Sequence, residues 1–140
     1  MKTLLKGEVD FVEKFNNWSL EIGVKWNKRT TNLTIKSRNN NLNSEFTPCK
    51  LSQFHLFTLL SYITRARSDS FSFYGSKSKY SDLILESPIT TSLMEAKNAT
   101  IRLEGKYLMF SGGIRKKDKT SLSNIFKLNE MLIQEIDTLK

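Results

Sequence analysis

The chain has very few of the residues from which metal sites, disulfides and hydrolytic centres are built. Its 140 residues include one histidine, His55, and one cysteine, Cys49. A single cysteine excludes a disulfide within the chain, and one imidazole with one thiol is too few ligands for a zinc site. A Cys49 nucleophile with His55 as its base would still need an oxyanion-stabilising element, and none lies nearby. We therefore expect no metal, no cofactor and no enzyme activity.

Long apolar segments are also missing. No apolar run approaches the 18 or so residues that a membrane span requires, and residues 1–6 have too short an apolar core for a signal peptide. The lone cysteine suits a reducing compartment. We therefore expect a cytoplasmic protein without membrane association.

Acidic residues are outnumbered by basic ones. The chain has 22 Lys and Arg against 14 Asp and Glu, a formal net charge of +8. The cations concentrate in residues 25–38, 65–79 and 102–119, whereas the C-terminal segment is slightly acidic. An excess of this size favours an acidic polymer as partner.

Residues 18–26 give the clearest secondary-structure pattern. Trp18, Leu20 and Ile22 alternate with Ser19 and Glu21, which predicts a strand with one buried and one solvated face. Further strands are expected over 4–15, 33–38, 71–74, 80–86, 99–104 and 107–110, with 45–48 an edge strand or a turn because of its proline. Residues 111–119 are expected to form a loop rich in glycine and cations, while 89–97 are ambiguous.

Two segments half a chain length apart resemble each other. Leu51-Ser52-Gln53 and Leu122-Ser123-Asn124 each precede apolar residues spaced three and four apart, so we expect helices from Ser52 to about Ala66 and from Ser121 or Ser123 nearly to Lys140. The sequence thus predicts one α+β domain of two β-β-β-β-α repeats, 1–67 and 68–140, whose antiparallel sheets carry the helices on one face. The alternative is that two serine-capped amphipathic helices look alike by chance.

Cations and aromatics together fall on the expected strands and hairpins. Such a surface suits an unpaired strand, because cations neutralise phosphates and aromatic rings stack on bases. The alternative is a solvated charged face with the aromatics in the core. The residues expected to contact nucleic acid are Lys25, Trp26, Lys28, Arg29, Lys36, Arg38, Tyr74, Lys77, Lys79, Tyr80, Arg102, Lys106, Tyr107, Arg115 and Lys116.

The order of strands and helix resembles the single-stranded DNA-binding fold of positive cofactor 4 and, in tandem form, the plant Whirly proteins. The resemblance rests on the hairpin 18–38, the helix entry Lys50-Leu51-Ser52-Gln53-Phe54 and its counterpart 120–136. It implies binding through the sheet and assembly through the helices as a dimer or tetramer. The length and composition also look like those of a phage protein with this fold, acting in the host cytoplasm.

The sequence therefore predicts a non-enzymatic protein that binds single-stranded DNA without sequence preference, in the replication or recombination of phage DNA. Two alternatives stay open. One is an RNA-binding or transcription-cofactor module with the same surface. The other is an oligomeric structural protein that binds no nucleic acid and whose charge is incidental.

Overall fold

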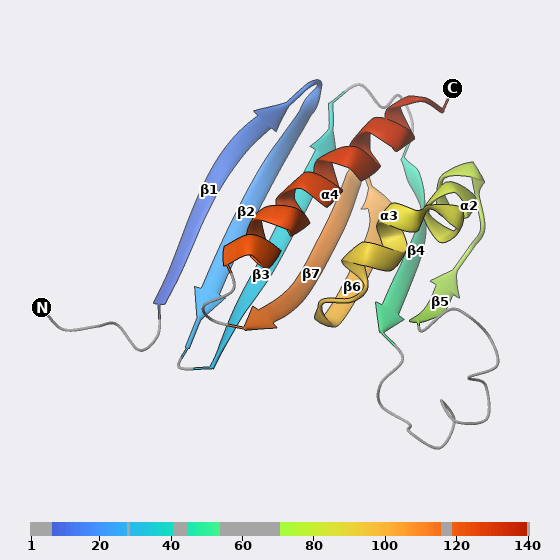
Figure 1. Ribbon diagram of the computed structural model, residues 1–140. Helices are drawn as coiled ribbons and strands as arrows, with labels where there is room; N and C mark the ends of the chain where they lie inside the picture. Colours follow the sequence, from blue (N-terminus) through green and yellow to red (C-terminus); the bar gives the residue numbers. More distant parts are fainter. Residues whose placement is uncertain (1–6, 28, 41–44, 54–70, 116–118, 140) are drawn as a thin grey trace, which may run out of the picture.

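In the computed structural model, seven strands form a single antiparallel sheet (Figure 1). The structure describes residues 7–27, 29–40, 45–53, 71–115 and 119–139. The strands follow the order β1-β2-β3-β7-β6-β4-β5 across the sheet. Their bounds are β1 Gly7–Phe15, β2 Trp18–Trp26, β3 Thr30–Asn39, β4 Phe46–Gln53, β5 Phe71–Gly75, β6 Lys97–Gly105 and β7 Tyr107–Arg115.

The first three strands form the meander that the sequence predicts. The alternation along β2 is confirmed, because Trp18, Leu20 and Ile22 are buried whereas Glu21 is exposed. A two-residue turn joins β1 to β2, and its first residue, Asn16, has a φ of 55°. Asparagine tolerates this left-handed conformation better than most residues do.

Strand β4 corrects two expectations. It lies between β5 and β6 and is not an edge strand as a whole, but its pairing with β5 begins only at Cys49, so the segment that contains Pro48 has a paired strand on one side only. The pairing with β6 shifts register between Phe46 and Cys49, on either side of Pro48. A bulge is a place where a sheet accepts proline, which has no N–H to donate. Ser52 lies within this strand, not at the start of a helix, and the rest of the helix expected over 52–66 falls almost entirely outside the described residues.

Strand β7 replaces most of the expected glycine-rich loop. Gly112 and Gly113 continue the ladder with β3 instead of forming a turn. A Cβ at Gly112 would come within 2.9 Å of the Ala96 Cβ and of the Phe110 ring. Glycine is therefore required here by close packing on the residues that precede β6.

The described chain has three helices: α2 Lys79–Glu86 and α3 Pro88–Leu93 between β5 and β6, and α4 Lys119–Asp137 after β7. The strand expected over 80–86 is therefore wrong. Ser78 caps α2 through a reciprocal pair of hydrogen bonds with Ser81, and this local cap favours a helix over a strand. Pro88 opens α3, where its missing N–H costs nothing. The C-terminal helix is confirmed, although it begins at Lys119, before both serines expected as caps.

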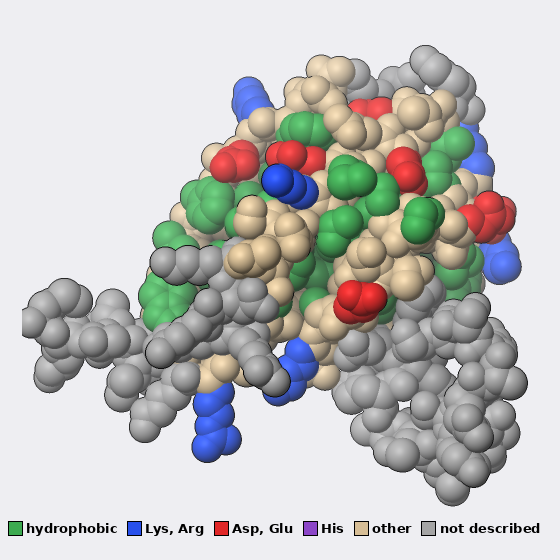
Figure 2. Space-filling model, in the orientation of Figure 1, with side chains coloured by type: hydrophobic (Ala, Val, Ile, Leu, Met, Phe, Trp, Pro, Cys, Tyr) green, Lys and Arg blue, Asp and Glu red, His purple; other side chains and the backbone are tan. Residues whose placement is uncertain are grey.

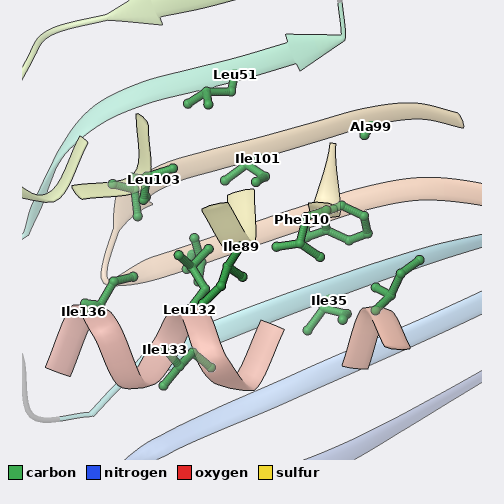
Figure 3. Packing of buried hydrophobic residues seen from close by; sticks show 14 of the residues in the cluster. Ile35, Leu51, Ile89, Ala99, Ile101, Leu103, Phe110, Leu132, Ile133 and Ile136 are labelled. Atoms are coloured by element: carbon green, nitrogen blue, oxygen red, sulfur yellow. The ribbon is translucent and has the colours of Figure 1, made fainter. Parts of the chain in front are cut away.

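All three helices lie on one face of the sheet, with α4 crossing it obliquely (Figure 1). Leu132, Ile133 and Ile136 on α4 are buried, and in Figure 3 Leu132 and Ile136 point toward the side of Ile101 and Leu103, whereas Ile133 points to the other side of the helix. Burial of each such side chain contributes roughly 1.5–3 kcal/mol. Because the described helices pack on this face, they leave the opposite face of the sheet open.

The arrangement of two β-β-β-β-α repeats is wrong. The strands form one continuous sheet instead of two similar units, and β3 pairs with β7 across the middle. The described chain is mainly β, with a segment of two short helices between β5 and β6 and one long helix after β7. Similar helix-entry sequences at Leu51 and Leu122 therefore do not reflect a similar structure.

Candidate nucleic-acid interface

The sheet face opposite the helices, called here the open face, carries the polar positions of each strand. In β3 and β2 these positions include Lys36, Arg38 and Lys25, because the alternate residues are buried against the helices. The register carries the same face across the other strands to Arg102 and Tyr107. The structure thus places cations that are far apart in sequence on one surface.

Four neighbouring strand pairs align residues into one line across the open face. Lys36 is opposite Met109, Met109 opposite Arg102, Arg102 opposite Lys50, and Lys50 opposite Tyr74. We call these five residues the cationic row. Strands lie about 4.8 Å apart, so the row extends roughly 19 Å across the sheet. It presents three cations with an aromatic ring at its end.

Tyr107 lies beside the row and contacts one of its cations. The Lys36 Nζ atom is 4.6 Å from the centre of the Tyr107 ring, a cation–π distance. Arg38 is the cross-strand partner of Tyr107 and donates a hydrogen bond of 2.7 Å to the Asn40 side chain. Both cations keep most of their hydrogen-bonding capacity for a ligand, because neither forms an ion pair in the described part of the chain.

The far end of the row forms a shallow groove. A hollow of about 250 Å³ is lined by Lys50, Tyr74, Arg102 and Glu104, together with Pro48 and Gly75. Tyr74 is 56% exposed, so one surface of its ring is accessible. Arg102 forms a 2.7 Å ion pair with Glu104, and both side chains are about half exposed. An exposed pair of this kind contributes little to stability, so a phosphate can compete with Glu104 for the guanidinium.

A second line of residues, next to the cationic row, consists of small hydroxyl side chains. Thr34 is opposite Ser111, Ser111 opposite Thr100, and Thr100 opposite Ser52. Hydroxyl groups hydrogen bond to phosphate and sugar oxygens without distinguishing between bases. The two lines together form a cationic and polar strip over β3, β7, β6 and β4.

The open face changes charge toward β1. Glu8, Asp10 and Glu21 lie there with Lys14 and Lys25. Asp10, Glu21 and Lys25 line a hollow of about 480 Å³ over Gly23. Acids thus outnumber cations on β1 and β2, whereas cations outnumber acids on the described side chains of β3 to β5. A polyanion is therefore drawn to the β3–β5 half of the open face.

Six of the expected contact residues lie on the open face: Lys36, Arg38, Tyr74, Arg102 and Tyr107 in its β3–β5 half, and Lys25 on β2 opposite Glu8. Two expected aromatics lie on the helix side. Trp26 packs over Gly7, where an added Cβ would come within 2.5 Å of its ring, and Tyr80 packs edge-on against Phe46 at 5.0 Å. Neither ring can stack on a base that follows the open face.

The remaining expected cations lie at the ends of strands. Lys106 is in the β6–β7 turn, and Arg29 follows β2 and lines a helix-side cavity of about 920 Å³. Lys77 precedes α2 and Lys79 begins it. Arg115 is the last residue of β7, opposite Thr30. Lys28 and Lys116 lie outside the described residues. In Figure 2 the cations on the helix side are scattered and do not form a group.

Lys50 and the hydroxyl line were missed by the sequence interpretation. Lys50 follows Pro48 and precedes a segment expected to be helical, so nothing local indicated a sheet position. Only the pairing of β4 with both β5 and β6 places it between Tyr74 and Arg102. The hydroxyls of Thr34 and Ser111 could have been found from the alternation of their strands.

No metal centre is found in the described part of the chain. Within it, no three His, Cys, Asp or Glu side chains gather around a possible ion site. Burial raises the pKa of the Cys49 thiol, which disfavours the reactive thiolate. His55 lies outside the described residues.

None of the described helices is long and apolar enough to span a membrane. Comparisons with protein-family models, curated proteins and solved structures find no match to this chain.

Proposed function

We propose that the chain binds single-stranded nucleic acid, DNA in the first place, without reading its sequence. The observation that supports this is the cationic row, in which Lys36, Arg102 and Lys50 lie in line with the exposed ring of Tyr74. It lies on the sheet face that the described helices leave open. We further propose a role in phage DNA replication or recombination in the host cytoplasm, in line with the phage-like length and composition of the chain.

The position of the row on the sheet favours an unpaired strand over a duplex. The row lies on the broad face of a seven-stranded sheet, which cannot enter a major groove of about 12 Å to reach base edges. An unpaired strand can lie along the strip, with its phosphates near the three cations and a base on the Tyr74 ring. The neighbouring hydroxyls bond to backbone oxygens, which gives affinity without sequence readout.

Fluorescence anisotropy with labelled oligo-dT and a duplex of equal length tests the proposal. We expect tighter binding to oligo-dT, with an affinity that falls as salt rises, by a log–log slope of about −0.7 for each neutralised phosphate. Lys50→Glu and Arg102→Glu should each make that slope less negative. Lys127→Glu is the matched control, because Lys127 is exposed on α4 on the helix side.

Three outcomes would count against this function: equal affinity for the duplex, no binding to oligo-dT, or the same loss in the Lys127 variant. An RNA oligomer of matched sequence competes in a second arm. Preference for RNA would indicate a 2′-hydroxyl contact and move the proposal to RNA.

The stacking step has its own test. Tyr74→Leu keeps an apolar side chain but removes the ring, and because Tyr74 is largely exposed the change should leave the stability of the fold nearly unaltered. A stacked base contributes roughly 1–3 kcal/mol, so affinity should fall about 5- to 150-fold with an unchanged salt slope. Unchanged affinity would remove Tyr74 from the interface.

A further inference from the structure

Strand β1 forms one edge of the sheet among the described residues. It spans nine residues and pairs with β2 in an unbroken register, while no strand in the described part of the chain pairs with its other side (Figure 1). A two-residue turn follows Phe15, so the residues that flank it, Phe15 and Trp18, form a hydrogen-bonded pair. Hydrogen-bonded and non-hydrogen-bonded pairs then alternate along β1 and β2. The N–H groups of the non-hydrogen-bonded residues Glu8, Asp10, Val12 and Lys14 therefore point away from β2, toward the open edge.

This edge is also apolar for an exposed strand. Val9 is 45% exposed, Phe11 38% and Val12 68%. Figure 2 shows apolar side chains gathered along this side of the molecule. Proteins usually protect a sheet edge with a proline, a bulge or inward-pointing charges. The described strand has no proline and no register shift; its charges are Glu8, Asp10 and Lys14 on the open face and Glu13, opposite Leu20, on the helix side.

We propose that β1 pairs antiparallel with β1 of a second copy of this chain, about a two-fold axis at Phe11. Phe11 is the midpoint of Gly7–Phe15, so all nine residues of each strand find a partner. Glu8 of each copy is then opposite Lys14 of the other, which gives two pairs of opposite charge. Phe11 faces Phe11 in a non-hydrogen-bonded pair, where the side chains approach most closely.

The pairing of opposite charges and the full overlap of the two strands favour the register centred on Phe11 over a register shifted by two residues. A shift of two residues places Asp10 opposite Lys14, but it leaves Gly7 and Glu8 unpaired and puts Phe11 opposite Glu13. The register centred on Phe11 pairs Glu8 with Lys14 at both ends and Phe11 with Phe11 at its centre. Together the two sheets form one continuous sheet whose helices all lie on the same side, because an antiparallel pair about this axis keeps both open faces together. The surface is separate from the cationic row, so this inference does not depend on nucleic-acid binding.

Cysteine cross-linking tests the register in the full-length chain with Cys49→Ser as background. In Phe11→Cys the two thiols face each other with Cα atoms about 4.5 Å apart, within the range for a disulfide. We expect a covalent dimer under mild oxidation. In the control Val9→Cys, on the same side of the sheet, the two thiols lie four residues apart, roughly 13 Å, and should not cross-link. Equal cross-linking of both variants, or of neither, would overturn the proposal.

Sedimentation equilibrium tests the charges. Lys14→Glu places two like-charged pairs in the interface and should weaken dimerisation about tenfold, whereas Glu8→Lys/Lys14→Glu restores opposite charges and should recover it. Val12→Pro removes an outward N–H without touching the β2 ladder and should give a monomer. A wild-type chain that stays monomeric at all concentrations, or a double variant no better than Lys14→Glu, would refute the pairing.

Discussion

Replacing the buried amide of Asn129 on α4 should stabilise the fold. This side chain is 1% exposed, and its Nδ2 donates a 3.2 Å hydrogen bond to the Oγ of Ser37, which is fully buried on β3. Its Oδ1 has no hydrogen-bond partner among the described residues. Asn129 occupies a core position of the helix, four residues after Ile125 and three before Leu132.

The magnitude follows from the two polar groups. An unpaired buried acceptor costs about 1–3 kcal/mol, whereas one internal hydrogen bond contributes only about 0.5–1.5 kcal/mol. Asn129→Leu with Ser37→Ala removes both groups and adds apolar surface to the core. We expect a net gain of about 1 kcal/mol, or roughly 3 °C in Tm for a chain of this length. Ser37→Ala alone should destabilise by about 1–3 kcal/mol, because it leaves the amide without any partner.

Urea denaturation of the parent, both single variants and the double variant measures these terms in one cycle. The coupling energy isolates the contact between Asn129 and Ser37 from the effect of added volume. A double variant clearly less stable than the parent would refute the reasoning, since it would mean that the Oδ1 atom is satisfied in solution or that leucine overfills the site.

Three further outcomes are expected. Gly112→Ala should destabilise by about 1–3 kcal/mol in urea denaturation, because its Cβ would meet Ala96 at 2.9 Å. Cys49 should resist iodoacetamide at pH 8 in the native state and react once unfolded, because burial raises its thiol pKa; fast native alkylation would contradict its burial. Trp18→Phe should lose about 1 kcal/mol or more, because its indole N–H donates a 2.9 Å hydrogen bond to the Asp137 carboxylate, and unchanged thermal stability would show that this bond contributes nothing.

Local patterns predicted the parts of the fold that depend on local physics. Alternation along Trp18–Trp26 predicted β2, and the three- and four-residue spacing of Ile125, Leu128 and Leu132 predicted α4. The Ser78 cap and the helical spacing of Tyr80, Leu83 and Ile84 were also readable in the sequence, but the alternation of Leu83 with Leu85 was favoured over them.

Features that depend on distant partners could not be predicted. Gly112 stays in a strand because Ala96 approaches it, and Pro48 is tolerated in β4 because a register shift accommodates it. The open face was likewise predictable only where local patterns were enough. Alternation indicated that Lys36 is solvated, but only the order of the strands shows that Lys50 and Tyr74 lie in line with it.

The central place of β7 has a consequence for how the chain folds. Strands β3 and β6 are joined only through β7, so the meander at one end of the sheet cannot unite with the other strands until residues 107–115 are available. Contacts between segments this far apart in sequence slow folding. We therefore expect refolding in the slow, millisecond-to-second range despite the simple hairpins, and during synthesis the meander keeps an unpaired margin until residues 107–115 have been made. Refolding that is complete within the dead time of a stopped-flow instrument would show that sheet closure is not the limiting step.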